Sequence, residues 1–84
     1  MATLTEYTVS LRKGPLHAEE TVREHKASDI DGAENFIDSL RDYVAQREHV
    51  KWQSEDVNAE GRMYGLAPGG IVYSILVHPP LGSL

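Results

Sequence analysis

Most side chains that could carry acid–base, nucleophilic or metal chemistry are spread along this sequence without a recognised motif. The four histidines are His17, His25, His49 and His78. Their separations give no His-x-x-x-His pattern or other metal-ligand spacing. Cysteine is absent and no serine stands in a Gly-x-Ser-x-Gly motif, so neither a thiolate nor an activated hydroxyl is indicated. The sequence therefore favours a protein that is not an enzyme and that needs no metal or cofactor.

Carboxylates are the one reactive group that the chain has in excess. Thirteen acidic residues against eight lysines and arginines give a formal net charge of −5, and twelve of the acids lie between residues 19 and 60. General acid–base catalysis needs a carboxyl group that is removed from water, because burial raises its pKa. The acids of this region instead fall on the polar side of a helix or beside turns. The negative charge also argues against a large phosphate-binding surface, so nucleic acid is not expected as a partner.

One strongly amphipathic helix is predicted from residue 28 to residue 46. Apolar residues at helical spacing form its inner face: Ile30, Ala33, Phe36, Ile37, Leu40, Tyr43 and Val44. The opposite side carries four acidic residues: Asp31, Glu34, Asp38 and Asp42. Ser28 is predicted to cap the first turn, because Asp31 three residues later completes an acidic capping-box pattern.

These four acids are interpreted as a docking surface for a basic protein partner. Glu34–Asp38 and Asp38–Asp42 are like-charge pairs four residues apart, and each pair costs about 0.2–0.5 kcal/mol. No lysine or arginine interrupts the row. Such a surface would bind a Lys/Arg-rich protein patch, and an inhibitor that imitates a nucleic-acid backbone is one form of this function. The alternative is that the acids only keep the protein soluble.

The rest of the chain predicts an antiparallel sheet of four or five strands. The candidate strands are residues 4–12, 20–27, 50–57, 62–67 and 71–78. Alternating or continuous apolar residues identify them, and turn sequences such as Pro68-Gly69-Gly70 separate them. With the helix the order is ββαβββ, so the fold class is α+β. We expect a single domain over residues 1–84, with the helix on one face of the sheet.

The last strand is apolar on both sides, which predicts a central position in the sheet. Ile75 and its alternate neighbours supply one face, whereas Val72 and Leu76 supply the other. A single helix covers only one face of a sheet. The second face is therefore covered either by loops and the tail residues 81–84 or by a second copy of the chain. The latter predicts a homodimer with Val72 and Leu76 in its interface.

Two other functions remain open from the sequence. The first hairpin carries four cations: Arg12, Lys13, Arg23 and Lys26. If they form one basic patch, the chain is a nucleic-acid-binding domain that uses this hairpin and its sheet. A pocket between the sheet and a dimer partner would instead make it a small ligand-binding protein or enzyme.

The expected location is the cytoplasm, without a membrane partner. The chain lacks cysteine, which fits a reducing compartment. Its first residues lack the basic start and apolar run of a signal peptide. The longest apolar run, within residues 71–77, is too short to cross a bilayer.

Overall fold

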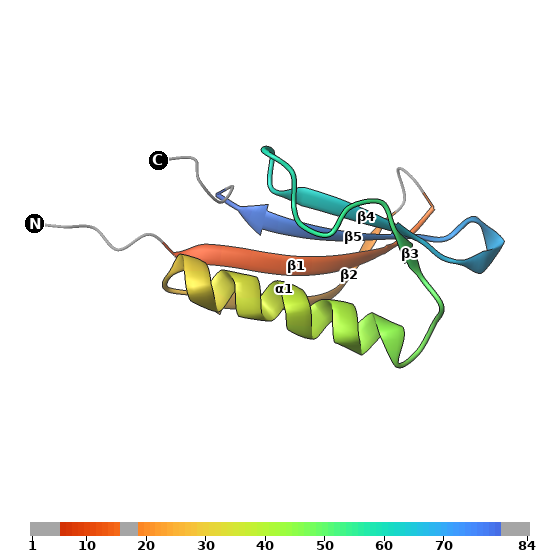
Figure 1. The fold of residues 1–84 in the computed structure, drawn as a ribbon, viewed down its shortest axis with the longest axis horizontal. Coiled ribbons are helices and arrows are strands. Elements are labelled where there is room, and N and C mark those ends of the chain that lie inside the picture. The colour runs from red at the N-terminus through yellow and green to blue at the C-terminus, as the bar shows by residue number, and fades with distance from the viewer. Residues whose placement is uncertain (1–5, 16–18, 80–84) are drawn as a thin grey trace, which may run out of the picture.

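A five-stranded sheet and one α-helix make up the described part of the fold (Figure 1). The computed structural model describes residues 6–15 and 19–79 of the 84-residue chain. In chain order the elements are β1 (Tyr7–Gly14), β2 (Glu20–Ala27), α1 (Ile30–Ala45), β3 (Lys51–Trp52), β4 (Arg62–Leu66), the 3-10 turn η1 (Pro68–Gly70) and β5 (Val72–His78). The predicted α+β class with the order ββαβββ is confirmed.

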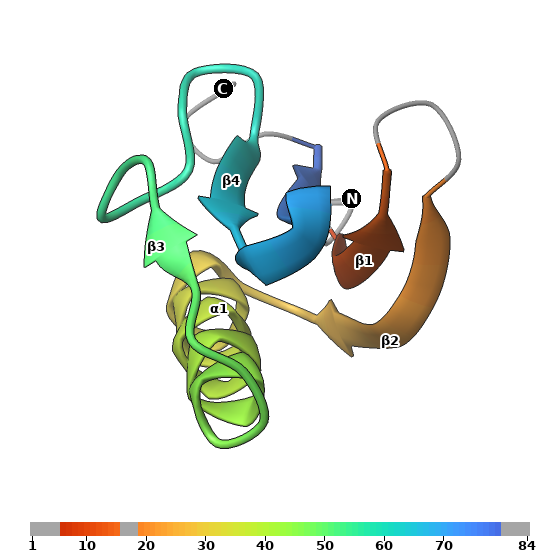
Figure 2. The ribbon, with the colours of Figure 1, turned by 90° about the vertical axis from the view of Figure 1, so that its right-hand side faces the viewer.

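All neighbouring strands are antiparallel, and the sheet has the order β2-β1-β5-β4-β3. β5 therefore lies in the middle, as its two apolar sides predicted. β2 and β3 lie at the two edges of the sheet, and α1 lies on one side of it (Figure 2). Within the described residues, the opposite face of the sheet has no helix against it. We call this second side the open face.

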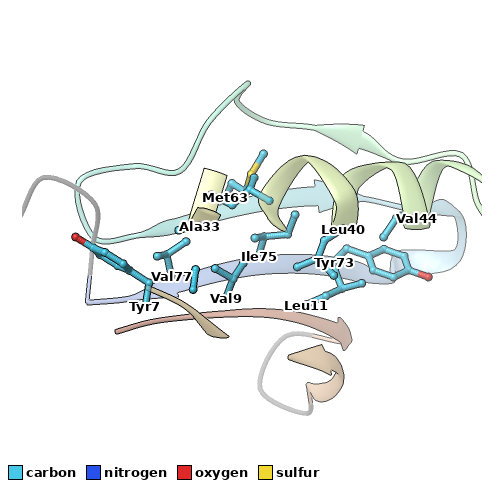
Figure 3. Close-up of a cluster of buried hydrophobic side chains, with 12 residues drawn as sticks. Tyr7, Val9, Leu11, Ala33, Leu40, Val44, Met63, Tyr73, Ile75 and Val77 are labelled. Carbon is cyan, nitrogen blue, oxygen red and sulfur yellow. The ribbon is translucent and has the colours of Figure 1, made fainter. Parts of the chain in front are cut away.

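The core lies between α1 and the side of the sheet that faces it (Figure 3). The helix contributes residues from its predicted inner face: Ala33, Ile37, Leu40 and Val44. The sheet contributes alternate residues of three strands: Tyr7, Val9, Leu11, Met63, Tyr73, Ile75 and Val77. Burial of one large apolar side chain contributes about 1.5–3 kcal/mol. This layer therefore fixes which side of α1 faces water.

The helix begins one residue later than the capping pattern predicts. Asp29, and not Ser28, is the N-cap, and its carboxylate accepts a hydrogen bond of 2.7 Å from the backbone amide of Gly32. A carboxylate at this position also interacts favourably with the positive end of the helix dipole. Ile30 is the first residue of the helix, and its side chain is 38% exposed rather than part of the buried inner face.

At the other end of α1, the Arg47 guanidinium donates a hydrogen bond of 3.0 Å to the carbonyl of Tyr43. This contact satisfies one of the carbonyl groups that a helix leaves free in its last turn.

In the described ranges, no helix combines the length and the apolar character that crossing a membrane requires.

The strand predicted over residues 50–57 is wrong for most of its length, because β3 consists only of Lys51–Trp52. After Trp52 the polar side chains bond to the local backbone instead of leaving it free for a ladder. The Ser54 hydroxyl donates to the carbonyl of Asp56, and the Asp56 carboxylate accepts from the amide of Val57. Short-range bonds of this kind favour turns over strands.

The ends of the other strands differ by a few residues from the ends predicted from the sequence. β1 runs on to Gly14, and the predicted start at residues 4 and 5 lies outside the described residues. β4 ends at Leu66 and β5 begins at Val72, each one residue inside the predicted strand. Between them, Gly69 and Gly70 adopt φ values of 82° and 77°, which favour glycine in the predicted turn.

A close approach at Gly65 positions β3. Gly65 pairs with Trp52 in the sheet. A β-carbon at Gly65 would overlap the Val50 side chain and lie 2.8 Å from Cε3 of the Trp52 indole. The missing side chain therefore allows the indole to lie against the sheet, beside the core.

Candidate functional site

The four predicted partner-binding residues, Asp31, Glu34, Asp38 and Asp42, are all exposed on α1. They lie away from the buried residues of the helix, as the helical spacing predicted. Asp31 lies in the first turn of the helix, and the other three lie on later turns. The structure thus presents a row of carboxylates to water.

The loop after β3 adds two further carboxylates to this row. Glu55 and Asp56 line a hollow of about 190 Å³ together with Glu34, Ile37 and Asp38. Four acidic side chains from two distant parts of the chain therefore line one depression together with the buried Ile37. Glu55 and Asp56 were not predicted as site residues, because the sequence pattern placed them at the end of a strand beside a turn.

Two larger hollows continue this depression along the helix. One, of about 480 Å³, is lined by Asp38, Arg41, Asp42, Ala45, Val50 and Trp52. The next, of about 500 Å³, is lined by residues 45–50 and Trp52. Asp38 is shared by the first two hollows, whereas Ala45, Val50 and Trp52 are shared by the last two. The first two hollows, which share Asp38, lie along α1 beside β3 and its loop, and we call them together the α1–β3 groove. The third hollow adjoins the groove at the end of the helix and is not part of it.

Polar and apolar residues are divided within the α1–β3 groove. Its acidic residues are Glu34, Asp38, Asp42, Glu55 and Asp56. Val50 and Trp52 provide apolar surface and are half-buried against the core. Asp31 does not line any of the three hollows, so three of the four predicted residues belong to the groove.

Arg41 connects the helix to the loop and the strand on the other side of the groove. Its guanidinium donates a hydrogen bond of 2.9 Å to the carbonyl of Glu55, and its Cζ lies 5.7 Å from the centre of the Trp52 ring. Arg41 therefore joins α1 to both the loop and β3. This contact keeps the carboxylates of Glu55 and Asp56 close to those of the helix.

The acidic residues of the groove have no cationic partner among the described residues. Within residues 6–15 and 19–79, the one ion pair joins Lys26 to Glu6 at 3.7 Å, on β2 and just before β1. The five carboxylates are also exposed, so they lack the removal from water on which acid–base catalysis depends. Exposed, unpaired carboxylates beside apolar surface are suited to binding a cationic group.

A second group of charges lies on the other side of α1, toward β2. The cations predicted as one basic patch on the first hairpin are divided between the two sides of the sheet. Lys13 and Arg23 lie on the helix side, where they contact tyrosine rings. Arg12 pairs across the sheet with Ser74, and Lys26 pairs with Thr8, on the open face. The prediction that the four cations of the first hairpin form one basic patch is therefore wrong.

Two tyrosines organise the cations on the helix side. The Cζ atoms of Arg23 and Arg47 lie 4.2 and 3.7 Å from the centre of the Tyr43 ring. Lys13 Nζ lies 5.6 Å from the centre of the Tyr73 ring, and the Tyr73 hydroxyl donates a hydrogen bond to the Glu48 carboxylate. We call these residues the cation–tyrosine cluster: Lys13, Arg23, Tyr43, Arg47, Glu48 and Tyr73.

The cluster moves the pKa values of its tyrosines in opposite directions. A hydrogen bond from Arg23, followed by the charge of Arg47, lowers the pKa of Tyr43 despite some burial. Burial raises the pKa of Tyr73, and the hydrogen bond to Glu48 raises it further. Hydrogen bonding with Tyr73 raises the pKa of Lys13, which keeps the ammonium group charged.

The residues predicted for a dimer interface, Val72 and Leu76, are half-buried on the open face. Between them Ser74 is 1% exposed, and its hydroxyl donates to the Glu19 carboxylate at 3.2 Å. Glu19, from the connection between β1 and β2, thus lies over part of this face. The tail residues 81–84, the other predicted cover, lie outside the described residues.

The described histidines lie on separate elements: His25 on β2, His49 after α1 and His78 at the end of β5. His25 stacks on Phe36 with ring centres 4.6 Å apart, and His17 lies outside the described residues. In the part of the chain that the structure describes, no three His, Asp or Glu side chains are arranged to hold a metal ion.

Comparisons with known proteins add no assignment. No protein-family model, curated protein or solved structure matches the chain.

Proposed function

We propose that this protein is a cytoplasmic interaction module that binds a basic segment of a partner protein in the α1–β3 groove. Lysine or arginine side chains of the partner pair with the carboxylates of the groove, and an apolar side chain contacts Val50 and Trp52. The observation that carries the proposal is the convergence of Glu55 and Asp56 with Glu34 and Asp38 around one hollow.

The dimensions of the groove favour a short segment. The helix from Glu34 to Ala45 spans about 17 Å at 1.5 Å per residue. An extended chain advances about 3.3 Å per residue, so about five partner residues lie alongside this length. A Lys/Arg-rich segment of that size would place alternate side chains toward the acids.

The charges contribute mainly to recognition and to the rate of association. Exposed ion pairs are worth about 0.2–1 kcal/mol each, so a few of them give modest affinity. Complementary charge nevertheless steers the encounter and rejects acidic competitors. Tryptophan is common among the residues that dominate binding energy, which assigns the anchoring contact to Trp52.

A labelled Arg/Lys-rich peptide with a central leucine tests this proposal by fluorescence anisotropy. The variant is D38K/D42K, and the matched control is E24K/E60K, which changes the net charge equally. Glu24 and Glu60 are exposed and do not line the groove. We expect D38K/D42K to weaken binding at least about tenfold, or about 1.4 kcal/mol. The control should retain affinity within about twofold.

Two results would contradict the proposal. Equal loss in both variants would mean that net charge alone attracts the peptide, as for an acidic surface that only aids solubility. Binding that stays unchanged between about 50 and 300 mM salt would exclude pairing by exposed charges. Circular dichroism confirms that each variant keeps its helix before affinities are compared.

A partner surface that normally binds nucleic acid would make the protein an inhibitor that imitates a nucleic-acid backbone. Once such a partner is identified, a short DNA duplex should compete with this protein for the same surface of the partner. A partner that binds DNA and this protein simultaneously would exclude the inhibitor form while leaving groove binding intact.

A further inference from the structure

We propose that the cation–tyrosine cluster binds a phosphate monoester group, independently of the α1–β3 groove. The cluster lies on the side of α1 that faces β2, so its ligand would not occupy the groove between α1 and β3. Its cations come from β1, β2 and the turn after α1, and only the folded chain brings them together.

The cations of the cluster are unusual because they gather in a chain of net charge −5 without forming ion pairs. Among the described residues, Lys13, Arg23 and Arg47 have no carboxylate within 4.0 Å of their nitrogens. Three cations therefore hold donors that internal carboxylates do not occupy. An anion bound at this point would accept hydrogen bonds from these donors.

The aromatic ring prepares the two arginines for such a ligand. The Cζ atoms of Arg23 and Arg47 both lie within 4.2 Å of the Tyr43 ring centre, a distance at which an aromatic ring attracts a guanidinium. A guanidinium has five N–H donors, so those that do not bond to Tyr43 are left for the oxygen atoms of a ligand. Arg47 is further fixed by its hydrogen bond to the Tyr43 carbonyl. A guanidinium held in this way loses less side-chain entropy when it binds phosphate.

Opposing charges near the cluster are fewer than the cations. Glu48 keeps its charge while it accepts a hydrogen bond from the Tyr73 hydroxyl, and Glu20 lies opposite Lys13 in the register of β1 and β2 without an ion pair. The end of α1 adds about half a negative charge. Three cations exceed this sum, so the local field still favours an anion.

A compact dianion fits better than an extended polyanion. Nucleic acid requires a stripe of positive charge along its backbone. Here Glu20 lies opposite Lys13 on the helix side of β2, and Glu48 lies beside Tyr73. These acids would repel the further phosphates of a longer polyanion. A single monoester, which carries about two charges at pH 7, concentrates its charge on the cations.

Titrations followed by backbone NMR test this site with four probes at constant ionic strength. The probes are inorganic phosphate, a phosphoserine peptide, the same peptide without phosphate, and a short DNA duplex. We expect phosphate and the phosphopeptide to give saturable shifts at the amides of Arg23, Tyr43 and Arg47. A tighter phosphopeptide would identify a protein-borne monoester as the source, whereas equal affinities would identify the free ion.

The variant R23Q/R47Q should weaken phosphate binding at least fivefold. The control R12Q/R62Q removes the same charge from the other side of the sheet and should leave binding unchanged. If R23Q/R47Q does not fold, K13Q provides the comparison and should weaken binding at least twofold. Wild-type binding should also weaken below about pH 6, where a monoester loses its second charge.

Several outcomes would overturn the site. They are equal shifts with the unphosphorylated peptide, full binding by R23Q/R47Q or by a K13Q replacement, and tighter binding of DNA than of either phosphate probe. The groove proposal is not affected by these results, because D38K/D42K tests it with a peptide of opposite charge.

Discussion

At the scale of single residues, the missing side chain of Gly65 decides where Trp52 lies. We expect G65A to destabilise the protein by about 1–3 kcal/mol, the usual cost of forcing extra atoms into a packed site. Val50 and Trp52 are the side chains that must move. Urea unfolding measures the loss, and the emission of Trp52, the single tryptophan, reports the displacement.

The control for this change is G69A. Gly69 has a φ of 82° and open space around it, so alanine strains the backbone but contacts nothing within 4 Å. Stability should fall by about 1 kcal/mol while the native Trp52 emission stays the same. Native G65A with wild-type stability and emission would show that the indole does not depend on this close approach.

The two tyrosines of the cation–tyrosine cluster should also ionise at different pH values. The pKa of Tyr43 is lowered by Arg23, whereas burial and Glu48 raise the pKa of Tyr73. Ultraviolet titration of Y43F and Y73F should show that Y43F removes a component at lower pH than the one Y73F removes. The reverse order would contradict the described contacts.

The raised pKa of Tyr73 also makes the stability of the protein depend on pH in the alkaline range. Because its folded pKa is raised, the stabilising contribution is complete below the unfolded value of about 10 and is lost as pH rises through the folded value. Unfolding measurements should therefore show stability falling on the alkaline side, and less steeply in Y73F.

At the scale of the elements, the start of α1 depends on Asp29. We expect D29A to lower stability by about 0.5–2 kcal/mol, because it removes the acceptor for the Gly32 amide. The matched change S28A should have little effect, since Ser28 is not the N-cap. Thermal unfolding of the two variants compares them directly. A larger loss for S28A would return the cap to Ser28.

The elements were predictable where the pattern is local. The 3.6-residue spacing from Ile30 to Val44 identified the inner side of α1 except for the exposed Ile30, and the apolar run from Ile71 to Val77 identified β5 as central. The end of β3 was not predictable in this way. Ser54 and Asp56 are compatible with a polar strand, and only their bonds to the nearby backbone decide for a turn.

The candidate site was predictable only in part. The helix spacing placed Glu34, Asp38 and Asp42 on one exposed side, because that relation is local. The approach of Glu55 depends on its contact with Arg41, fourteen residues away. The separation of Lys13 from Arg12 onto different sides follows from strand alternation, but the approach of both Lys13 and Arg47 to Tyr43 requires the complete fold.

At the scale of the whole molecule, the open face raises the question of a second copy. Val72 and Leu76 are half-buried there, and Leu66 beside them is 50% exposed. The homodimer remains a prediction: sedimentation should show a dimer that L76E converts to monomer. The control is Y64F, which removes only a hydroxyl from the same face. A monomer at all concentrations of the unchanged protein would contradict it.

The charges of the whole molecule are separated across α1. Unpaired carboxylates line the α1–β3 groove on one side, and the cation–tyrosine cluster lies on the other. A basic peptide and a phosphate group should therefore bind at the same time without competing for one surface. Because the groove and the cluster lie apart, the position of a bound basic peptide can be mapped to one or the other.

The most direct test of the groove is therefore a map of where the basic peptide binds. NMR spectra recorded during addition of the Arg/Lys-rich peptide report on every amide and on the indole N–H of Trp52. We predict that the largest saturable shifts fall on the Trp52 indole and on residues 34–42 and 54–57. The account would be contradicted if the largest shifts fell on the open face or on the cation–tyrosine cluster, or if no shift approached saturation.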